Sequence, residues 1–205
     1  KQDIMVSEVH FHLRVIKSIY HLIQGALLEK KPDNFGGLMF GRQYKGNGNG
    51  DAKSIVIVER IVPAEQIRPN MDIGPENSDL LVDEIEELVA KNKKMALLGW
   101  FTSSSDSDNE MPDNLVKIHR TYFSEKWQIA SLIYPGSDQM NSGRFIRRKS
   151  GYFDTVPTDG FRLSWDELYQ FAVDPPAKKV MEEKKRPDSS EYVKIELNQN
   201  WCESI

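Results

Sequence analysis

The chain has 205 residues, of which 39% are hydrophobic and 28% are charged, so it is long enough for one full hydrophobic core with or without a tail. Its net charge of −4 and pI near 5.7 argue against nucleic acid as the main partner, and no apolar run approaches the ~20 residues that a membrane-spanning helix needs. The only cysteine, Cys202, cannot form an internal disulfide, and no signal peptide is visible, so we expect a cytoplasmic protein.

Strand and helix patterns alternate through the first part of the chain. Residues 4–13 alternate loosely between apolar and polar side chains, which predicts a strand or a strand that runs into a helix. Helical spacing then continues to about Lys30. Residues 35–44 and 55–62 predict the two strands of a hairpin, because the glycine and asparagine residues at 46–51 adopt positive φ angles at little cost.

The next segment carries the signals of a charged amphipathic helix over about residues 78–93. Asn77 or Ser78 is its expected N-cap, and its acidic residues precede its lysines, as the helix macrodipole favours. Further elements are expected in this order: a strand at 95–101, a helix at 113–123, a strand at 127–134 and a hairpin that turns near residues 150–151.

The C-terminal part of the chain is predicted to hold a helix, a linker and one more strand. Residues 164–167 form a capping box, Ser-Trp-Asp-Glu, and the helix that it begins should end by Asp174. Residues 177–190 are rich in lysine, glutamate and proline, which is typical of a linker. The alternating segment 191–197 then needs a sheet edge, either of its own sheet or of a partner, and we weigh the two equally. The residues expected to contact that edge or a partner are Val193, Ile195, Leu197 and Trp201.

Residues 99–105 form the most informative motif, Gly-Trp-Phe-Thr-Ser-Ser-Ser, which follows an apolar run and precedes a polar, acidic loop. Together with three other segments it resembles the MPN/JAMM family of zinc isopeptidases, in which this motif reads G-W-[YF]-H-S-H-P. The resemblance covers about residues 4–155. It implies an α/β fold of the MPN type, a cytidine-deaminase-like mixed sheet flanked by helices, to which the C-terminal helix and the tail strand are appended. The other matching segments are Gly36–Gly41, Ile61–Pro63 and the passage from His119 to Pro135.

Where the family has its zinc ligands and catalytic residues, this chain has other residue types. The resemblance implies that the catalytic glutamate corresponds to Asn34 and the two zinc-binding histidines to Thr102 and Ser104. The family's serine and its zinc-binding aspartate fall near Pro112 and Leu115. Zinc-dependent hydrolysis needs about three strong ligands, an open position for water and a base, and hydroxyl groups and an amide do not supply these. The resemblance therefore implies an inactive member with no metal, no cofactor and no catalytic residue.

Histidines mark two further candidate sites beside the MPN-like motif. His10 and His12 share a strand face and have the spacing of a metal-ligand pair. An exposed strand face or a helix start is the simpler interpretation, because no third ligand lies adjacent. His119 follows the expected metal position and is interpreted as a structural residue that packs or forms a hydrogen bond.

The sequence thus predicts an MPN-like domain over residues 1–155, an appended helix over 156–176, and a linker with a tail strand over 177–205. Inactive members of the family pair with another MPN domain or act as scaffolds, so the resemblance implies a non-catalytic protein-interaction subunit. Its partner would be a second MPN domain, another copy of this chain or a ubiquitin-like protein. Two alternatives stay open: a JAMM-type isopeptidase or peptidase with atypical ligands, and a binder of a ubiquitin-like protein through the vestigial cleft between Thr102 and Glu110.

Overall fold

The part of the chain that the structure describes contains three helices and ten strands. The computed structural model describes residues 5–31, 34–45, 53–68, 75–104, 113–135, 140–146, 148–149, 152–153, 158–164 and 192–196. The helices are α1 (Leu13–Leu28), α2 (Pro75–Lys91) and α3 (Asp113–Tyr122). The strands are β1 (Met5–His12), β2 (Gly36–Lys45), β3 (Lys53–Pro63), β4 (Ala96–Ser103), β5 (Ile129–Tyr134), β6 (Met140–Ile146), β7 (Arg148–Lys149), β8 (Tyr152–Phe153), β9 (Thr158–Ser164) and β10 (Tyr192–Glu196).

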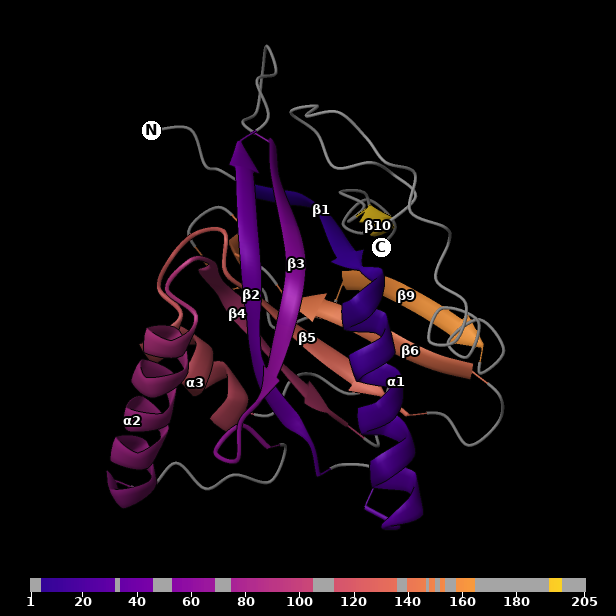
Figure 1. Cartoon of the computed structure of the whole chain (residues 1–205). Coiled ribbons are helices and arrows are strands. Elements are labelled where there is room, and N and C mark those ends of the chain that lie inside the picture. Colours follow the sequence, from indigo (N-terminus) through magenta and orange to yellow (C-terminus); the bar gives the residue numbers. More distant parts are fainter. Residues whose placement is uncertain are drawn as a thin grey trace.

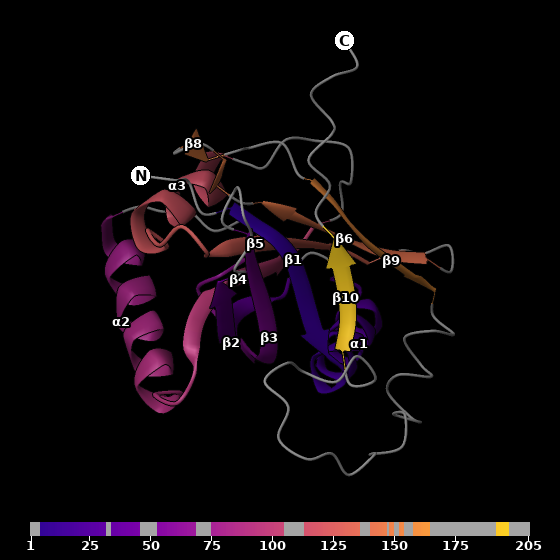
Figure 2. The same cartoon turned by 90° about the horizontal axis from the view of Figure 1, so that it is seen from above.

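Eight of the strands form one mixed sheet in the order β10-β1-β3-β2-β4-β5-β6-β9, and β7 pairs separately with β8. Neighbouring strands are antiparallel, except for the parallel pairs β1–β3 and β4–β5. The sheet curls, so that its two edge strands, β9 and β10, approach each other (Figure 2). The predicted α/β class with a mixed sheet is confirmed.

Helices cover both faces of this sheet (Figure 1). α1 packs on one face through Ile16 and Ile19, in a core that includes Phe101. α2 and α3 pack on the other face, where Leu81 lies in a second core with Trp100. Because successive strand residues point to opposite faces, the neighbours Trp100 and Phe101 anchor one core each. No helix within the described residues has the length and apolar character needed to cross a membrane.

The junction of β1 and α1 contains no loop, in agreement with the prediction of a strand that runs into a helix. His12 keeps an extended backbone, with φ −62° and ψ 141°, and is the N-cap of α1. Its Nδ1 atom accepts a hydrogen bond from the Arg14 N–H at 3.1 Å. This bond satisfies one of the backbone donors that the first turn of a helix leaves without a helical partner.

The start of α2 differs from the prediction. The helix begins at Pro75 and not near residue 78, so the expected capping role of Asn77 or Ser78 is wrong. Proline suits the first turn of a helix because its φ is already fixed and its missing N–H would have no helical acceptor there. The Ser78 hydroxyl instead forms a hydrogen bond with the Tyr122 hydroxyl, which links α2 to α3.

The C-terminal strands bring both confirmations and one strand that was not predicted. The hairpin near residues 150–151 is confirmed as β7–β8, in which Arg148 lies opposite Phe153. β9 occupies residues 158–164, which fall within the segment predicted for the appended helix, and it pairs with β6. The predicted strand at 191–197 is confirmed as β10, which pairs with β1. The predicted helix after Ser164 and the linker at 177–190 lie outside the described residues.

Candidate functional site

The positions that the resemblance assigns to a metal site lie where β2 begins and β4 ends. Thr102 lies opposite Gly36 in the antiparallel β2–β4 pair, and Asn34 comes just before β2. Ser104 follows β4 directly, and its N–H donates to the carbonyl of Ile133 on β5 at 2.8 Å. The structure therefore brings Asn34, Thr102 and Ser104 to the same end of the sheet.

Two buried hydroxyl groups at this end are engaged with the backbone of Phe35. Thr102 Oγ1 donates to the Phe35 carbonyl at 3.3 Å. Ser103 Oγ donates to the same carbonyl at 3.1 Å and accepts from the Phe35 N–H at 3.2 Å. A hydroxyl that donates to a carbonyl keeps its proton, whereas zinc prefers imidazole, thiolate and carboxylate ligands. These side chains therefore hold the start of β2 against the end of β4.

Asn34 occupies the position that the resemblance gives to the catalytic glutamate. Its side chain is exposed, and its Oδ1 accepts a hydrogen bond from Arg68 Nη1 at 3.3 Å. A neutral amide cannot take a proton from a water molecule, so this position supplies no general base.

The resemblance places the family's zinc-binding aspartate near Leu115. This leucine is 1% exposed and belongs to the core that α2 and α3 share with the sheet. Pro112 and the acidic segment 106–110 lie outside the described residues. Within the described part of the chain, no three His, Cys, Asp or Glu side chains are grouped in a way that could hold a metal ion.

Steric crowding explains why the Gly-Trp motif begins with a glycine. Gly99 has a φ of +140°, and a Cβ atom placed on it would lie 1.8 Å from the carbonyl oxygen of Ile129. The parallel β4–β5 pair therefore requires a residue without a side chain at this point. Packing alone explains this part of the motif.

His119 supports the core, as predicted. It is fully buried, and its Nδ1 accepts a hydrogen bond from Trp100 Nε1 at 3.1 Å. Because an indole N–H can only donate, Nδ1 must be unprotonated. The imidazole also packs near the ring of Phe123, with 5.7 Å between the ring centroids. The second residue of the Gly-Trp motif is thereby tied to α3.

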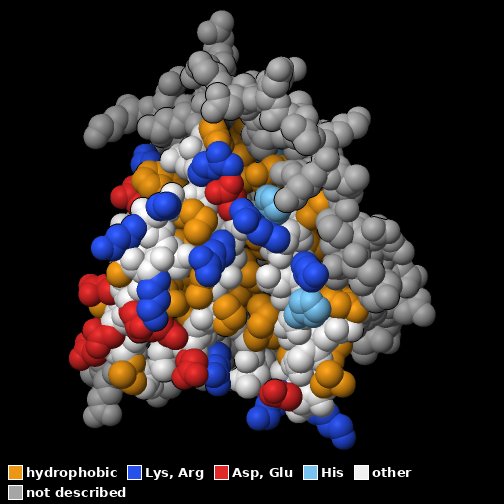
Figure 3. Space-filling view, in the orientation of Figure 1, with side chains coloured by type: hydrophobic (Ala, Val, Ile, Leu, Met, Phe, Trp, Pro, Cys, Tyr) orange, Lys and Arg blue, Asp and Glu red, His pale blue; other side chains and the backbone are white. Residues whose placement is uncertain are grey.

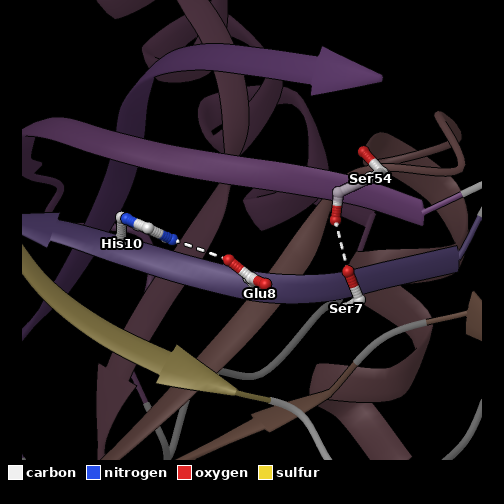
Figure 4. A network of polar contacts seen from close by, with 4 residues as sticks. All are labelled: Ser7, Glu8, His10 and Ser54. Carbon is white, nitrogen blue, oxygen red and sulfur yellow. Dashed lines mark hydrogen bonds and ion pairs between the residues drawn. The ribbon is translucent and has the colours of Figure 1, made fainter. Parts of the chain in front are cut away.

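His10 and His12 do not act together. His10 Nε2 lies 3.0 Å from Glu8 Oε2 on the same strand, and Ser7 Oγ donates to the Ser54 carbonyl on β3 at 3.4 Å (Figure 4). His12 instead caps α1, and its ring meets that of Tyr192 edge to face at 5.1 Å. The helix-start interpretation fits His12, which is the N-cap of α1. The exposed-face interpretation is wrong, because both side chains are partly buried.

The predicted contact residues of the tail strand fall on β10 only in part. Val193 lies in register opposite Phe11, and Ile195 lies opposite Val9. Leu197 and Trp201 lie outside the described residues. β10 thus covers the edge of β1, and the alternating segment has the sheet edge that was predicted for it from the sequence.

A pocket that sequence reasoning missed opens where the first turn of α1 meets the end of β3 and the residue before β4. Its volume is about 450 Å³, and we call it the α1–β3 pocket. The pocket lies at the opposite end of β4 from Thr102, since Met95 immediately precedes that strand. Its lining residues are Arg14, Val15, Ser18, Glu59, Arg60, Ile61 and Met95.

Comparison with known proteins does not assign the chain to a family. No protein-family model and no curated protein sequence matches it. Among solved structures, it is similar to the solution structure of protein DSY2949 from Desulfitobacterium hafniense, with 18% sequence identity and a TM-score of 0.43. The match covers 73% of this chain and 88% of that chain. A similarity of this extent carries no argument about function, so the class defined here is a mixed α/β domain.

Proposed function

We propose that this chain is an inactive, MPN-like protein-interaction subunit. One observation carries the proposal: Thr102, at the position of the first zinc-binding histidine, is fully buried and donates its hydroxyl proton to the Phe35 carbonyl. Asn34 and Leu115 support it, because one carries an amide bound to a guanidinium and the other is a core leucine. The surroundings of Thr102, Asn34 and Leu115 thus support a structural or solvent-facing role for these three positions.

The proposed partner is a protein, either a second MPN domain, another copy of this chain or a ubiquitin-like protein. Isotope-labelled protein titrated with each candidate would locate the binding surface by amide shifts. Shifts over the helices or β10 support a scaffold role. Shifts confined to residues 102–104 support the alternative, a ubiquitin-like protein held in the vestigial cleft.

Metal analysis tests the inactive state. We expect protein purified without a histidine tag to contain well under one zinc ion per chain, because hydroxyl and amide groups replace the strong ligands. Stoichiometric zinc that depends on Ser104 would favour the alternative of a hydrolase with atypical ligands.

Restoring the two histidines tests the same proposal from the other side. The double variant Thr102→His/Ser104→His should show no isopeptidase activity, since Asn34 still supplies no base and Leu115 no third ligand. Activity in this variant would mean that the catalytic glutamate or the aspartate lies elsewhere in the chain. Circular dichroism and the melting temperature must first show that the variant folds, because position 102 is buried.

A further inference from the structure

The charged residues that line the α1–β3 pocket are Arg14, Arg60 and Glu59, and Glu59 already has an ion-pair partner outside the pocket lining. The carboxylate of Glu59 forms an ion pair with Arg42, and this hydrogen bond raises the pKa of Arg42 above its usual value, although partial burial opposes the shift. The backbone carbonyl of Glu59 accepts from Arg14 Nε at 2.8 Å. Glu59 therefore fixes the guanidinium of Arg14 without an ion pair between the two side chains among the described residues.

Two guanidinium groups keep donors for a ligand. Arg14 uses Nε, and its two terminal nitrogens make no hydrogen bond to the part of the chain that the structure describes. Arg60 is exposed and makes none there either. An arginine guanidinium presents its donors in a fixed plane that matches the two oxygens of a carboxylate.

The position of Arg14 is unfavourable for the helix itself. It lies in the first turn of α1, which contains no acidic residue, although the positive end of the helix macrodipole favours an acid there. An anion bound beside Arg14 would offset the repulsion between its guanidinium and the positive end of the helix macrodipole. On the face of the molecule drawn in Figure 3, Lys and Arg side chains gather over β2, β3 and the start of α1, whereas acidic side chains lie mainly over α2.

The floor of the pocket is apolar. Val15 and Ile61 are buried, and Met95 is partly buried. The volume of about 450 Å³ falls within the roughly 300–1,000 Å³ of small-molecule sites. An apolar floor under a cationic rim suits a ligand that carries one charge on a short hydrocarbon body.

We propose that the α1–β3 pocket binds a carboxylate attached to an aliphatic group of a few carbons, with Arg14 and Arg60 on the carboxylate and Val15, Ile61 and Met95 on the aliphatic part. Two sources share this chemistry, a free short-chain carboxylic acid and the C-terminal aliphatic residue of a polypeptide. The site is independent of the proposed function, since it contains none of the vestigial metal positions.

Titration of the full chain with hexanoate tests the proposal by amide shifts and calorimetry. We expect saturable binding, with the largest shifts at Val15, Ser18 and Ile61, and no comparable binding of uncharged 1-hexanol. N-acetylleucine, which mimics a polypeptide C-terminus, distinguishes the two sources: tighter binding than hexanoate assigns the pocket to a polypeptide end, and weaker binding assigns it to a free acid. Equal binding of 1-hexanol, or shifts confined to another surface, would overturn the proposal without any variant.

Three variants sharpen the test. Arg14→Gln and Arg60→Gln should each weaken hexanoate binding at least about tenfold, because each removes a charge-assisted contact. Arg120→Gln is the matched control, since this exposed arginine lies in the last turn of α3 and does not line the pocket. An equal loss in the control, or no loss in Arg14→Gln and Arg60→Gln, would contradict the assigned contacts.

Discussion

At the scale of single residues, the buried hydroxyl groups at the end of β4 form hydrogen bonds with the backbone of Phe35. Ser103 exchanges hydrogen bonds with both backbone groups of Phe35, a residue 68 positions away in the sequence. The Ser103 side chain therefore replaces part of a strand ladder at the point where β2 begins.

Removing this hydroxyl should reduce stability. We expect Ser103→Ala to lower the free energy of unfolding by about 1–3 kcal/mol, because the buried N–H of Phe35 loses its acceptor. Denaturant unfolding measures the change. Ser124→Ala, at an exposed position, is the control and should stay within about 0.5 kcal/mol of the wild type.

The buried pair of Trp100 and His119 gives a second prediction at this scale. His119→Leu should cost about 1–3 kcal/mol, because the indole N–H remains buried without an acceptor. Adding Trp100→Phe should then cost less than Trp100→Phe does alone. Additive losses in this double-mutant cycle would show that the hydrogen bond contributes nothing of its own.

At the scale of elements, periodicity predicted most helices and strands because each buried face repeats on a regular spacing. Residues such as Ile16 and Ile19 of α1 follow the helical period and lie in the core as expected. β9 was missed because a capping box at its last residue favoured a helix, while its own alternation over residues 158–164 is short. The start of α2 was misplaced because two polar residues were weighed as caps and Pro75 was not.

The sequence predicted the candidate site less completely than it predicted the helices and strands. The motif located the positions 102 and 104, but it did not show that Thr102 bonds to a carbonyl 67 residues away. The α1–β3 pocket gave no motif at all, because its lining comes from three parts of the chain that meet only after folding. Its one signal in the sequence was Arg14, a basic residue at the start of a helix.

Two glycines in different elements provide a matched test of packing. Gly99→Ala on β4 should cost about 3 kcal/mol or more, or prevent folding, because a Cβ atom would strike the carbonyl of Ile129 and the φ of +140° is strained for alanine. Gly25→Ala on α1 should stabilise the protein by about 0.5–1 kcal/mol, since a Cβ atom there would meet nothing within 4 Å and alanine favours a helix. Thermal unfolding followed by circular dichroism separates the two directions. A tolerated Gly99→Ala would mean that β4 and β5 are not as close as described.

At the scale of the whole molecule, β1 lies between strands from distant parts of the chain. It pairs in parallel with β3 and antiparallel with β10, and His12 meets Tyr192 through their rings. The N-terminal and C-terminal regions are thus joined in one sheet, so the tail strand belongs to the fold and is more than an appendage.

Truncation after Asp174 tests this joining. We expect the truncated chain to keep the oligomeric state of the full chain and to melt at a temperature lower by at least about 3 °C, because the edge of β1 loses its neighbour. Light scattering and calorimetry measure the two quantities. Loss of an oligomer with unchanged melting would instead mean that the tail strand pairs with another chain in solution. No change in either, with rapid amide exchange across residues 192–196 of the intact protein, would mean that β10 is not stably paired.

The late arrival of β10 also bears on synthesis of the protein in the cell. β1 is translated before β10, and this neighbour at the sheet edge follows only after the chain that separates His12 from Tyr192. At about 5–20 residues per second, the edge of β1 stays uncovered for roughly ten to forty seconds. During that time polar residues of β1, among them Glu8 and His10, discourage pairing with other nascent chains. Replacing both with apolar residues should therefore lower the soluble yield on expression more than it lowers the stability of the finished protein.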